Sequence, residues 1–175
     1  MLASVSTTNK TASIISNFAV DSRLISIKAE NQLLSNVNVL IWEGDITTLK
    51  IGAIVNAANE SLLGGGGIDG AIHKAAGPQL LTECRKLNGC NAGETKITSS
   101  YKLPCDAILH TVGPRYNEAR KQRCQELLSS CYRSCLEVAA ENGIRTIAFC
   151  SISTGIFGYP LGDATVIALT SVRDW

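Results

Sequence analysis

Short apolar runs alternate along the chain with segments in which apolar residues recur at helical spacing, and this pattern predicts strands and helices in turn. The β-branched and aliphatic runs predict strands over residues 37–42, 53–56, 96–99, 107–112 and 146–152. Helices are expected over residues 21–32, 69–76, 78–87, 118–142 and 161–175, with Asp163 capping the last one. Strands that alternate with helices predict an α/β layered fold with a largely parallel sheet between the helices.

The composition of the chain is that of one globular domain. Its 175 residues suffice for a single core, and its formal net charge is only +1. It has no cluster of Lys and Arg with interleaved aromatic residues, and its apolar runs are shorter than the roughly 20 residues of a membrane span. We therefore expect a monomer that binds neither nucleic acid nor membrane. Residues 1–20 are rich in Ser and Thr and are expected to form a disordered tail before a domain over residues 21–175.

The chain contains seven cysteines and no CxxC pair. An odd count without a secretory signal favours reduced thiols, and we expect a cytoplasmic or nuclear protein rather than a mitochondrial one. Cys131 and Cys135 have a spacing that suits a metal on a helix, but no His or second Cys pair completes a site, so we interpret them as core residues. Cys90 lacks a visible His partner and is discounted as a nucleophile.

Residues 56–78 combine two side-chain amides, a run of four glycines, one imidazole and two carboxylates, Glu60 and Asp69. A glycine run costs backbone entropy and adds nothing to a core, so it indicates a close approach of main chain to a ligand. The amides of residues 64–67 and the helix that follows form an anion cradle, and the loop after Ile152 offers a second one. Both loops leave a strand at its carboxyl end, so we expect them to face one cleft that suits a diphosphate.

Residues 65–70 formally satisfy the GxGxxG pattern of dinucleotide-binding folds. That fingerprint requires the glycines directly after a strand and an acidic residue about 20 positions later. Here other residues intervene, and Cys90 occupies the place of the acidic residue. The chain also lacks GxxxxGK[ST], which excludes the phosphate loop of NTPases at the level of motifs.

Four motifs in fixed order resemble the macro domain family, specifically its MacroD-type ADP-ribosyl hydrolase branch. They are GDITTL, IVNAANESLLGGGGIDGAIHKAAGP, HTVGP and SISTGIFGYP, and the resemblance covers residues 37–175. It implies a three-layer α/β/α fold with a mixed, largely parallel central sheet. It also implies a cleft for ADP-ribose or for ADP-ribosylated proteins, without a metal or another cofactor. Because the family continues into a further strand after the last helix, the sequence leaves open whether the domain is complete at its C-terminus.

The resemblance also implies a role for individual residues. Asp45 would accept a hydrogen bond from the adenine amino group, and the amide of Ile46 would read a ring nitrogen. Asn59 would hold the distal ribose, against which Phe157 would pack, and Asp69 would lie by its anomeric carbon. The full set of expected ligand-binding residues is Asp45, Ile46, Asn59, Gly66, Gly67, Ile68, Asp69, Ser153, Thr154, Gly155, Ile156 and Phe157.

The activity implied by the resemblance is hydrolysis of mono-ADP-ribose from acidic side chains and deacylation of O-acetyl-ADP-ribose, with Asn59 and Asp69 as catalytic residues. At a helix N-terminus the Asp69 carboxylate is well placed to orient or deprotonate a water. Two alternatives remain, a non-catalytic ADP-ribose reader and an inactive truncated fragment. Asp69 could also be a helix N-cap and Asn59 a turn residue, while His73 and His110 are interpreted as structural.

Overall fold

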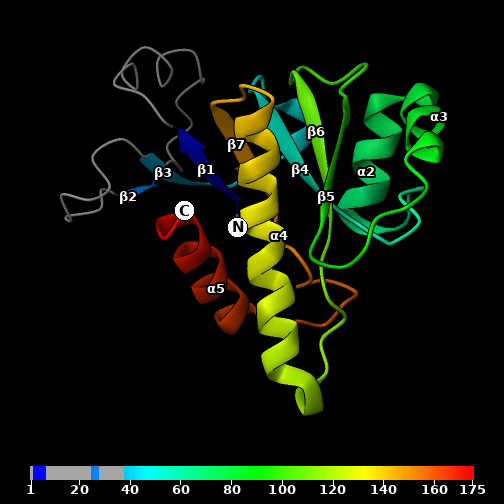
Figure 1. Ribbon diagram of the computed structural model, residues 1–175. Helices are drawn as coiled ribbons and strands as arrows, with labels where there is room; N and C mark the ends of the chain where they lie inside the picture. The colour runs from blue at the N-terminus through cyan, green and yellow to red at the C-terminus, as the bar shows by residue number, and fades with distance from the viewer. Residues whose placement is uncertain (1, 7–24, 28–37) are drawn as a thin grey trace.

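The computed structural model describes residues 2–6, 25–27 and 38–175, which form one sheet with helices on both sides (Figure 1). The strands lie in the order β2 (Ile25–Ile27), β3 (Asn38–Trp42), β1 (Leu2–Ser6), β7 (Thr146–Phe149), β4 (Ala53–Ala58), β6 (Ala107–Val112) and β5 (Thr95–Ser99). β4 pairs in parallel with β6 and β7, and β5 pairs antiparallel with β6. These four strands form the mixed, mostly parallel sheet that was predicted. β1, β2 and β3 extend it with antiparallel pairings.

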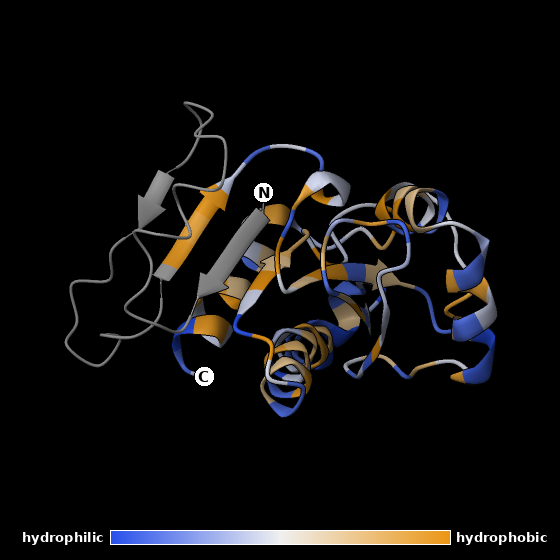
Figure 2. Cartoon of the chain, turned by 90° about the horizontal axis from the view of Figure 1, so that it is seen from above, coloured by the Kyte–Doolittle hydropathy of each residue, from blue (hydrophilic) through white to orange (hydrophobic). Residues whose placement is uncertain are grey.

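The helices of the described residues cover both faces of this sheet. They are η2 (Ile46–Thr48), α2 (Gly67–Ala76), α3 (Pro78–Lys86), η3 (Glu118–Arg120), α4 (Lys121–Glu141) and α5 (Leu161–Arg173). α4 and α5 lie side by side on one face, and α2 and α3 lie on the other (Figures 1 and 2). None of the helices in the described ranges has both the length and the apolar character needed to cross a membrane.

Contacts of β6 with α3 and with α4 show why the sheet needs two helical layers. The imidazole of His110 points toward Thr98 and the α3 residue Cys84, while the carbonyl of Val112 accepts from Cys131 of α4. All six residues of β6 are buried, as expected for a strand covered on both faces. Gly77, with φ +89°, ends α2, and Pro78 starts α3 at its first turn, where the missing N–H costs nothing.

Four details differ from the predictions. Leu2–Ser6 form β1 rather than part of a disordered tail, because the segment pairs with both β3 and β7. Ile25–Ile27 form a strand, so the predicted helix over residues 21–32 is wrong there, and the rest of both predictions lies outside the described residues. β7 ends at Phe149. Asp163 does not cap α5, which begins after Pro160, and instead its Oδ2 lies 3.0 Å from Nζ of Lys121.

Candidate functional site

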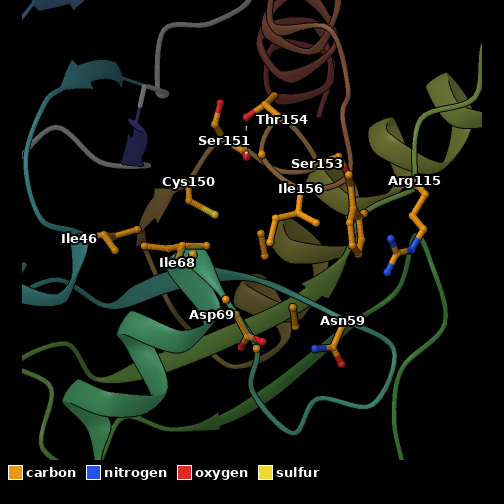
Figure 3. A pocket seen from close by; sticks show the side chains of 18 of the residues that line it. Ile46, Asn59, Ile68, Asp69, Arg115, Cys150, Ser151, Ser153, Thr154 and Ile156 are labelled. Carbon is orange, nitrogen blue, oxygen red and sulfur yellow. Dashed lines mark hydrogen bonds between the residues drawn. The ribbon is translucent and has the colours of Figure 1, made fainter.

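A cleft of about 530 Å³ opens beyond the carboxyl ends of β4 and β7. The loop after β4 forms one wall with the start of α2, and the loop after β7 forms the facing wall (Figure 3). The η2 corner closes one end with Asp45 and Ile46. The crevice outside the carboxyl ends of parallel strands is the usual ligand site of such sheets. The single cleft expected from the two glycine-bearing loops is therefore present.

All twelve residues predicted to bind the ligand line this cleft. They are Asp45, Ile46, Asn59, Gly66, Gly67, Ile68, Asp69, Ser153, Thr154, Gly155, Ile156 and Phe157. The cleft is also lined by residues outside this predicted set, namely Gly44, Ala57, Ala58, Gly65, Gly113, Arg115, Cys150 and Ser151. Their shared location is a finding of the structure, whereas the individual roles stay predictions.

The first wall consists of glycines in conformations that other residues avoid. Gly64 and Gly67 have φ of +85° and +61°, and Gly66 is the N-cap of α2. The amides of residues 64–66 donate to no acceptor among the described residues. A Cβ on Gly65 would lie 3.2 Å from both Asn59 Nδ2 and Asp69 Oδ2. The glycine run thus exposes amides at a helix N-terminus, an arrangement that binds anions.

The second wall is a loop held open by its own turn. Ser153 adopts φ +64°, and its carbonyl accepts a 2.9 Å bond from the amide of Tyr159. The amides of residues 154–157 find no acceptor in the described part of the chain. A Cβ on Gly113 would lie 2.0 Å from Oγ of Ser153, so this loop needs glycine in the HTVGP motif. Two sets of free amides therefore face each other across the cleft, as a diphosphate requires.

Asp69 is the buried carboxylate of the cleft. It lies in the first turn of α2 and is 3% exposed. Its Oδ1 accepts a 2.8 Å hydrogen bond from Nδ2 of Asn56, and its Oδ2 has no partner among the described residues. Gly66 is the N-cap of α2, so the alternative in which Asp69 merely caps this helix is wrong. A buried oxygen without a partner indicates a place for a water or a ligand hydroxyl.

Asn59 is held by its own loop. Its Nδ2 donates to the carbonyl of Gly64 at 2.8 Å, and its Oδ1 accepts bonds from the amide and the hydroxyl of Ser61. This is the turn arrangement that was considered for it in the sequence. Its Nδ2 would also lie 3.2 Å from a Cβ on Gly65, and Asn59 lines the cleft. Asn59 therefore shapes the first wall and can still donate one hydrogen bond to a ligand.

The two ends of the cleft differ in character. At one end Asp45 caps η2, since its Oδ1 accepts from the amide and the hydroxyl of Thr47, and Ile46 is buried beside it. At the other end the guanidinium of Arg115 lies 4.5 Å from the centre of the Phe157 ring. Nothing in the sequence analysis singled out Arg115. The only available signal was its position directly after HTVGP, a motif of the resemblance.

Comparison with known proteins decides the family. The Macro domain family matches residues 55–168. A macro domain-containing protein of Chlorobaculum tepidum is 58% identical over 139 residues, which are 78% of this chain and 80% of that protein. The chain belongs to the macro domain family. This macro domain is also 54% identical over 137 residues to human ADP-ribose glycohydrolase MACROD2, covering 78% of this chain but only 32% of MACROD2, so it spans about a third of that relative.

Solved structures agree with this assignment. The Oceanobacillus iheyensis macrodomain with ADP has a TM-score of 0.76 and 42% identity, covering 87% of this chain and 82% of that one. The Trypanosoma brucei macrodomain in complex with ADP-ribose has a TM-score of 0.71 and 51% identity, covering 76% and 55% of the two chains. The α/β macro fold predicted from the four motifs is confirmed.

In this macro domain a buried network of polar side chains connects Asp69 to strands β4, β6 and β5 of the sheet. The Asn56 amide nitrogen that donates to Asp69 also lies 3.0 Å from Nδ1 of His110, and Nε2 of His110 lies 2.8 Å from Oγ1 of Thr98. Burial, followed by the nearby His73, lowers the pKa of His110 to about 3. The ring is therefore neutral, accepts from Asn56 and donates to Thr98. The sequence analysis counted Asn56 among the amides of residues 56–78 but gave it no role, although a lone amide within the apolar run AIVNAA was a usable signal.

One group in the described part of the chain has the chemistry of a metal site. His73, Cys84 and His110 place one ligand atom each within 4.8 Å of one another. Nε2 of His110 is already engaged by Thr98, and burial raises the pKa of the Cys84 thiol to about 11. Nε2 of His73 lies 3.4 Å from Oδ1 of Asp69. Cys84 and His110 thus belong to the hydrogen-bonded layer between the sheet and α3, while Nε2 of His73 has no hydrogen-bond partner among the described residues.

The cysteines behave as core residues. All seven are unpaired and buried. Cys131 and Cys135 lie on the inner face of α4, where Cys131 donates to the carbonyl of Val112. Burial also raises the pKa of the Cys90 thiol to about 11, which makes it a poor nucleophile. The interpretation of Cys131 and Cys135 as core residues is confirmed, since both are buried on α4.

Proposed function

We propose that this macro domain hydrolyses the ester linking mono-ADP-ribose to Asp or Glu side chains of modified proteins, and that it deacylates O-acetyl-ADP-ribose. The observation that carries the proposal is the buried, unpartnered Oδ2 of Asp69 beside two walls of free amides. The similarity to ADP-ribose glycohydrolases supports an activity of this class.

The cleft would bind ADP-ribose through groups already in place. The amides of residues 64–66 and 154–157 would hold the diphosphate, and Asp45 with the Ile46 amide would hold the adenine. Phe157 would pack against the distal ribose at the other end. This orientation brings the anomeric carbon of that ribose toward Asp69.

Asp69 would act on a water rather than on the substrate directly. Oδ1 is occupied by Asn56, so Oδ2 alone is free to accept a hydrogen bond from the attacking water. As the water attacks the anomeric carbon, its proton passes to Oδ2, the bond between that carbon and the ester oxygen breaks, and the acidic side chain leaves as a carboxylate. A carboxylate is a good leaving group, which fits a site without an activated thiol or hydroxyl among the described residues.

A non-catalytic ADP-ribose reader is the second candidate. Its support is the Asn59 side chain, whose oxygen accepts two bonds from Ser61 and is thereby occupied within its own loop. In this case the same cleft would bind ADP-ribose, and Asp69 would hold a ribose hydroxyl instead of a reacting water.

Release of ADP-ribose separates the candidates. The protein is incubated with a peptide carrying mono-ADP-ribose on one Glu and, separately, with O-acetyl-ADP-ribose, and products are resolved chromatographically. We expect turnover of both substrates. A raised melting temperature with ADP-ribose but no turnover would identify a reader. The absence of both effects would contradict both candidates.

A further inference from the structure

A second pocket of about 680 Å³ adjoins the cleft at its distal end. The two share four lining residues, Asn59, Gly113, Arg115 and Phe157. From there the second pocket extends away between the loop after β6 and the start of α4, past Tyr116, Arg120 and Arg123. Nothing in the proposed binding of ADP-ribose uses this space.

The charge of the second pocket is distinctly positive in a nearly neutral protein. Arg115, Arg120 and Arg123 line it, and Glu60 is its one acidic residue. The whole chain has a formal net charge of only +1. Arg123 is compensated by Glu126, 3.2 Å away. Within the described ranges, no carboxylate lies within ion-pair distance of Arg115 or Arg120, so two guanidinium groups face this pocket uncompensated.

Hydrogen bonds hold the backbone around Arg115 and Arg120 in place. The amide of Tyr116 donates to the carbonyl of Phe157 at 2.8 Å, and the thiol of Cys124 lies 3.6 Å from the carbonyl of Arg115. Asn117 caps η3 by accepting from the amide of Ala119 at 2.9 Å. η3 ends with Arg120. The guanidinium groups therefore extend from an ordered rim, which lowers the entropy lost on binding.

The position of the pocket matches the path of a modified protein. In the proposed orientation the distal ribose lies against Phe157 and Asn59, which also line the second pocket. A polypeptide attached to the anomeric carbon must leave the cleft at this end. The residues next to the attachment point would then lie among Arg115 and Arg120.

We propose that this pocket binds the acidic segment of the modified protein that flanks the ester-bearing residue, with Arg115 and Arg120 pairing with its carboxylates. The proposal rests on the proposed function, since it names the protein part of that substrate. Guanidinium groups favour carboxylates because they offer a planar, bidentate pair of donors. The pocket thereby selects protein targets in which the modified Asp or Glu has acidic neighbours.

Binding of stable conjugates tests the proposal without depending on catalysis. Dissociation constants are measured by calorimetry for ADP-ribose alone and for ADP-ribose joined through a non-hydrolysable linkage to a Glu-rich or a matched Gln-rich peptide. We expect the Glu-rich conjugate to bind about three- to ten-fold more tightly than the Gln-rich one. The preference should shrink as salt is raised, because both guanidinium groups are exposed.

Charge-neutral variants locate the effect. Arg120→Gln, which lies outside the ADP-ribose cleft, should lose most of the preference while binding free ADP-ribose as the wild type does. Arg123→Gln should have a smaller effect because Glu126 already compensates that charge. Arg85→Gln, on the exposed face of α3 and outside both pockets, is the matched control and should keep the full preference.

Two outcomes would count against the proposal in different ways. Equal affinities for the Glu-rich and Gln-rich conjugates, or a preference that survives Arg120→Gln, would overturn the assignment of this pocket and leave the proposed function intact. Failure to bind free ADP-ribose would instead overturn the proposed function, and the assignment of the pocket with it.

Discussion

Asn56 and Asp69 form a buried pair in which the side-chain amide of Asn56 donates a 2.8 Å hydrogen bond to Oδ1 of Asp69. Asn56 belongs to β4 and is fully buried, so the rigid centre of the sheet sets the orientation of the carboxylate. The bond also gives the two carboxylate oxygens of Asp69 different roles. Oδ1 is fixed to the scaffold, and Oδ2 remains for the chemistry of the cleft.

Asn56→Ala should impair this positioning. Removing the amide leaves Asp69 Oδ1 and His110 Nδ1 without their shared donor, and we expect a loss of about 1–3 kcal/mol in the free energy of unfolding. We also expect kcat for the ADP-ribosylated peptide to fall about ten-fold or more at little changed KM, because a misplaced carboxylate orients water poorly.

Asn142→Ala is the matched control for this substitution. The Asn142 amide also donates to an oxygen, the carbonyl of Val138 at 2.8 Å, but at the exposed end of α4. Its loss should change stability by well under 1 kcal/mol and leave kcat unaltered. Equal effects of the two substitutions would contradict a special role of Asn56.

Asp69→Asn should abolish most of the turnover while preserving binding. The new side chain can still accept from Asn56 but is too weak a base to take a proton from water, so kcat should fall by about 10² to 10⁴. Asp163→Asn changes a carboxylate at the equivalent place in the first turn of α5, outside the cleft, and should leave kcat unchanged. Calorimetry should show comparable ADP-ribose affinity for both variants, and a parallel loss of binding and turnover in Asp69→Asn would argue against a catalytic role.

Gly113→Ala should distort the second wall. A Cβ there would lie 2.0 Å from Oγ of Ser153 and 2.6 Å from Cγ2 of Ile152, both on the loop that carries the free amides. We expect a loss of about 1–3 kcal/mol in stability and at least ten-fold weaker ADP-ribose binding. Gly162→Ala, where a Cβ meets nothing within 4 Å in α5, should instead be neutral or stabilising, by up to about 1 kcal/mol. Thermal melts and calorimetry measure both variants.

His110 should make the protein less stable in mild acid. Its pKa is lowered to about 3 by burial, so below about pH 6.5 the unfolded chain binds a proton that the folded protein excludes. Stability contributed by the neutral ring is therefore present above pH 6.5 and is lost as the pH falls, with a slope of up to about 1.4 kcal/mol per pH unit.

Urea unfolding between pH 7 and pH 5 measures this slope. His110→Gln should remove it, even if the variant is less stable throughout. His73→Gln retains His110, the other of the two histidines in the chain, and should keep the slope. A slope that is identical in the wild type and in His110→Gln would contradict the assignment.

Much of the cleft could be predicted from local sequence, because main-chain amides of two loops form its walls. Positive φ angles favour glycine, and Gly64, Gly67 and Gly158 display that preference directly in these two loops. Helix and strand boundaries from Pro78 to Glu141 followed in the same way from proline, glycine and apolar spacing. The N-terminal strand was missed because LASVS is short and its partners, β3 and β7, are distant in sequence.

The sequence by itself therefore determined the family, the glycine-built walls and the candidate residues Asn59 and Asp69, since these depend on local conformation and on motif order. Only the tertiary structure decided that Asn56 and His110 support Asp69 and that Asn59 bonds within its own loop. It alone placed Arg115 and Arg120 at the exit of the cleft. Such contacts join strands and helices far apart in the chain, and a hydrogen bond or a shared pocket between them exists only once the sheet has set their distance.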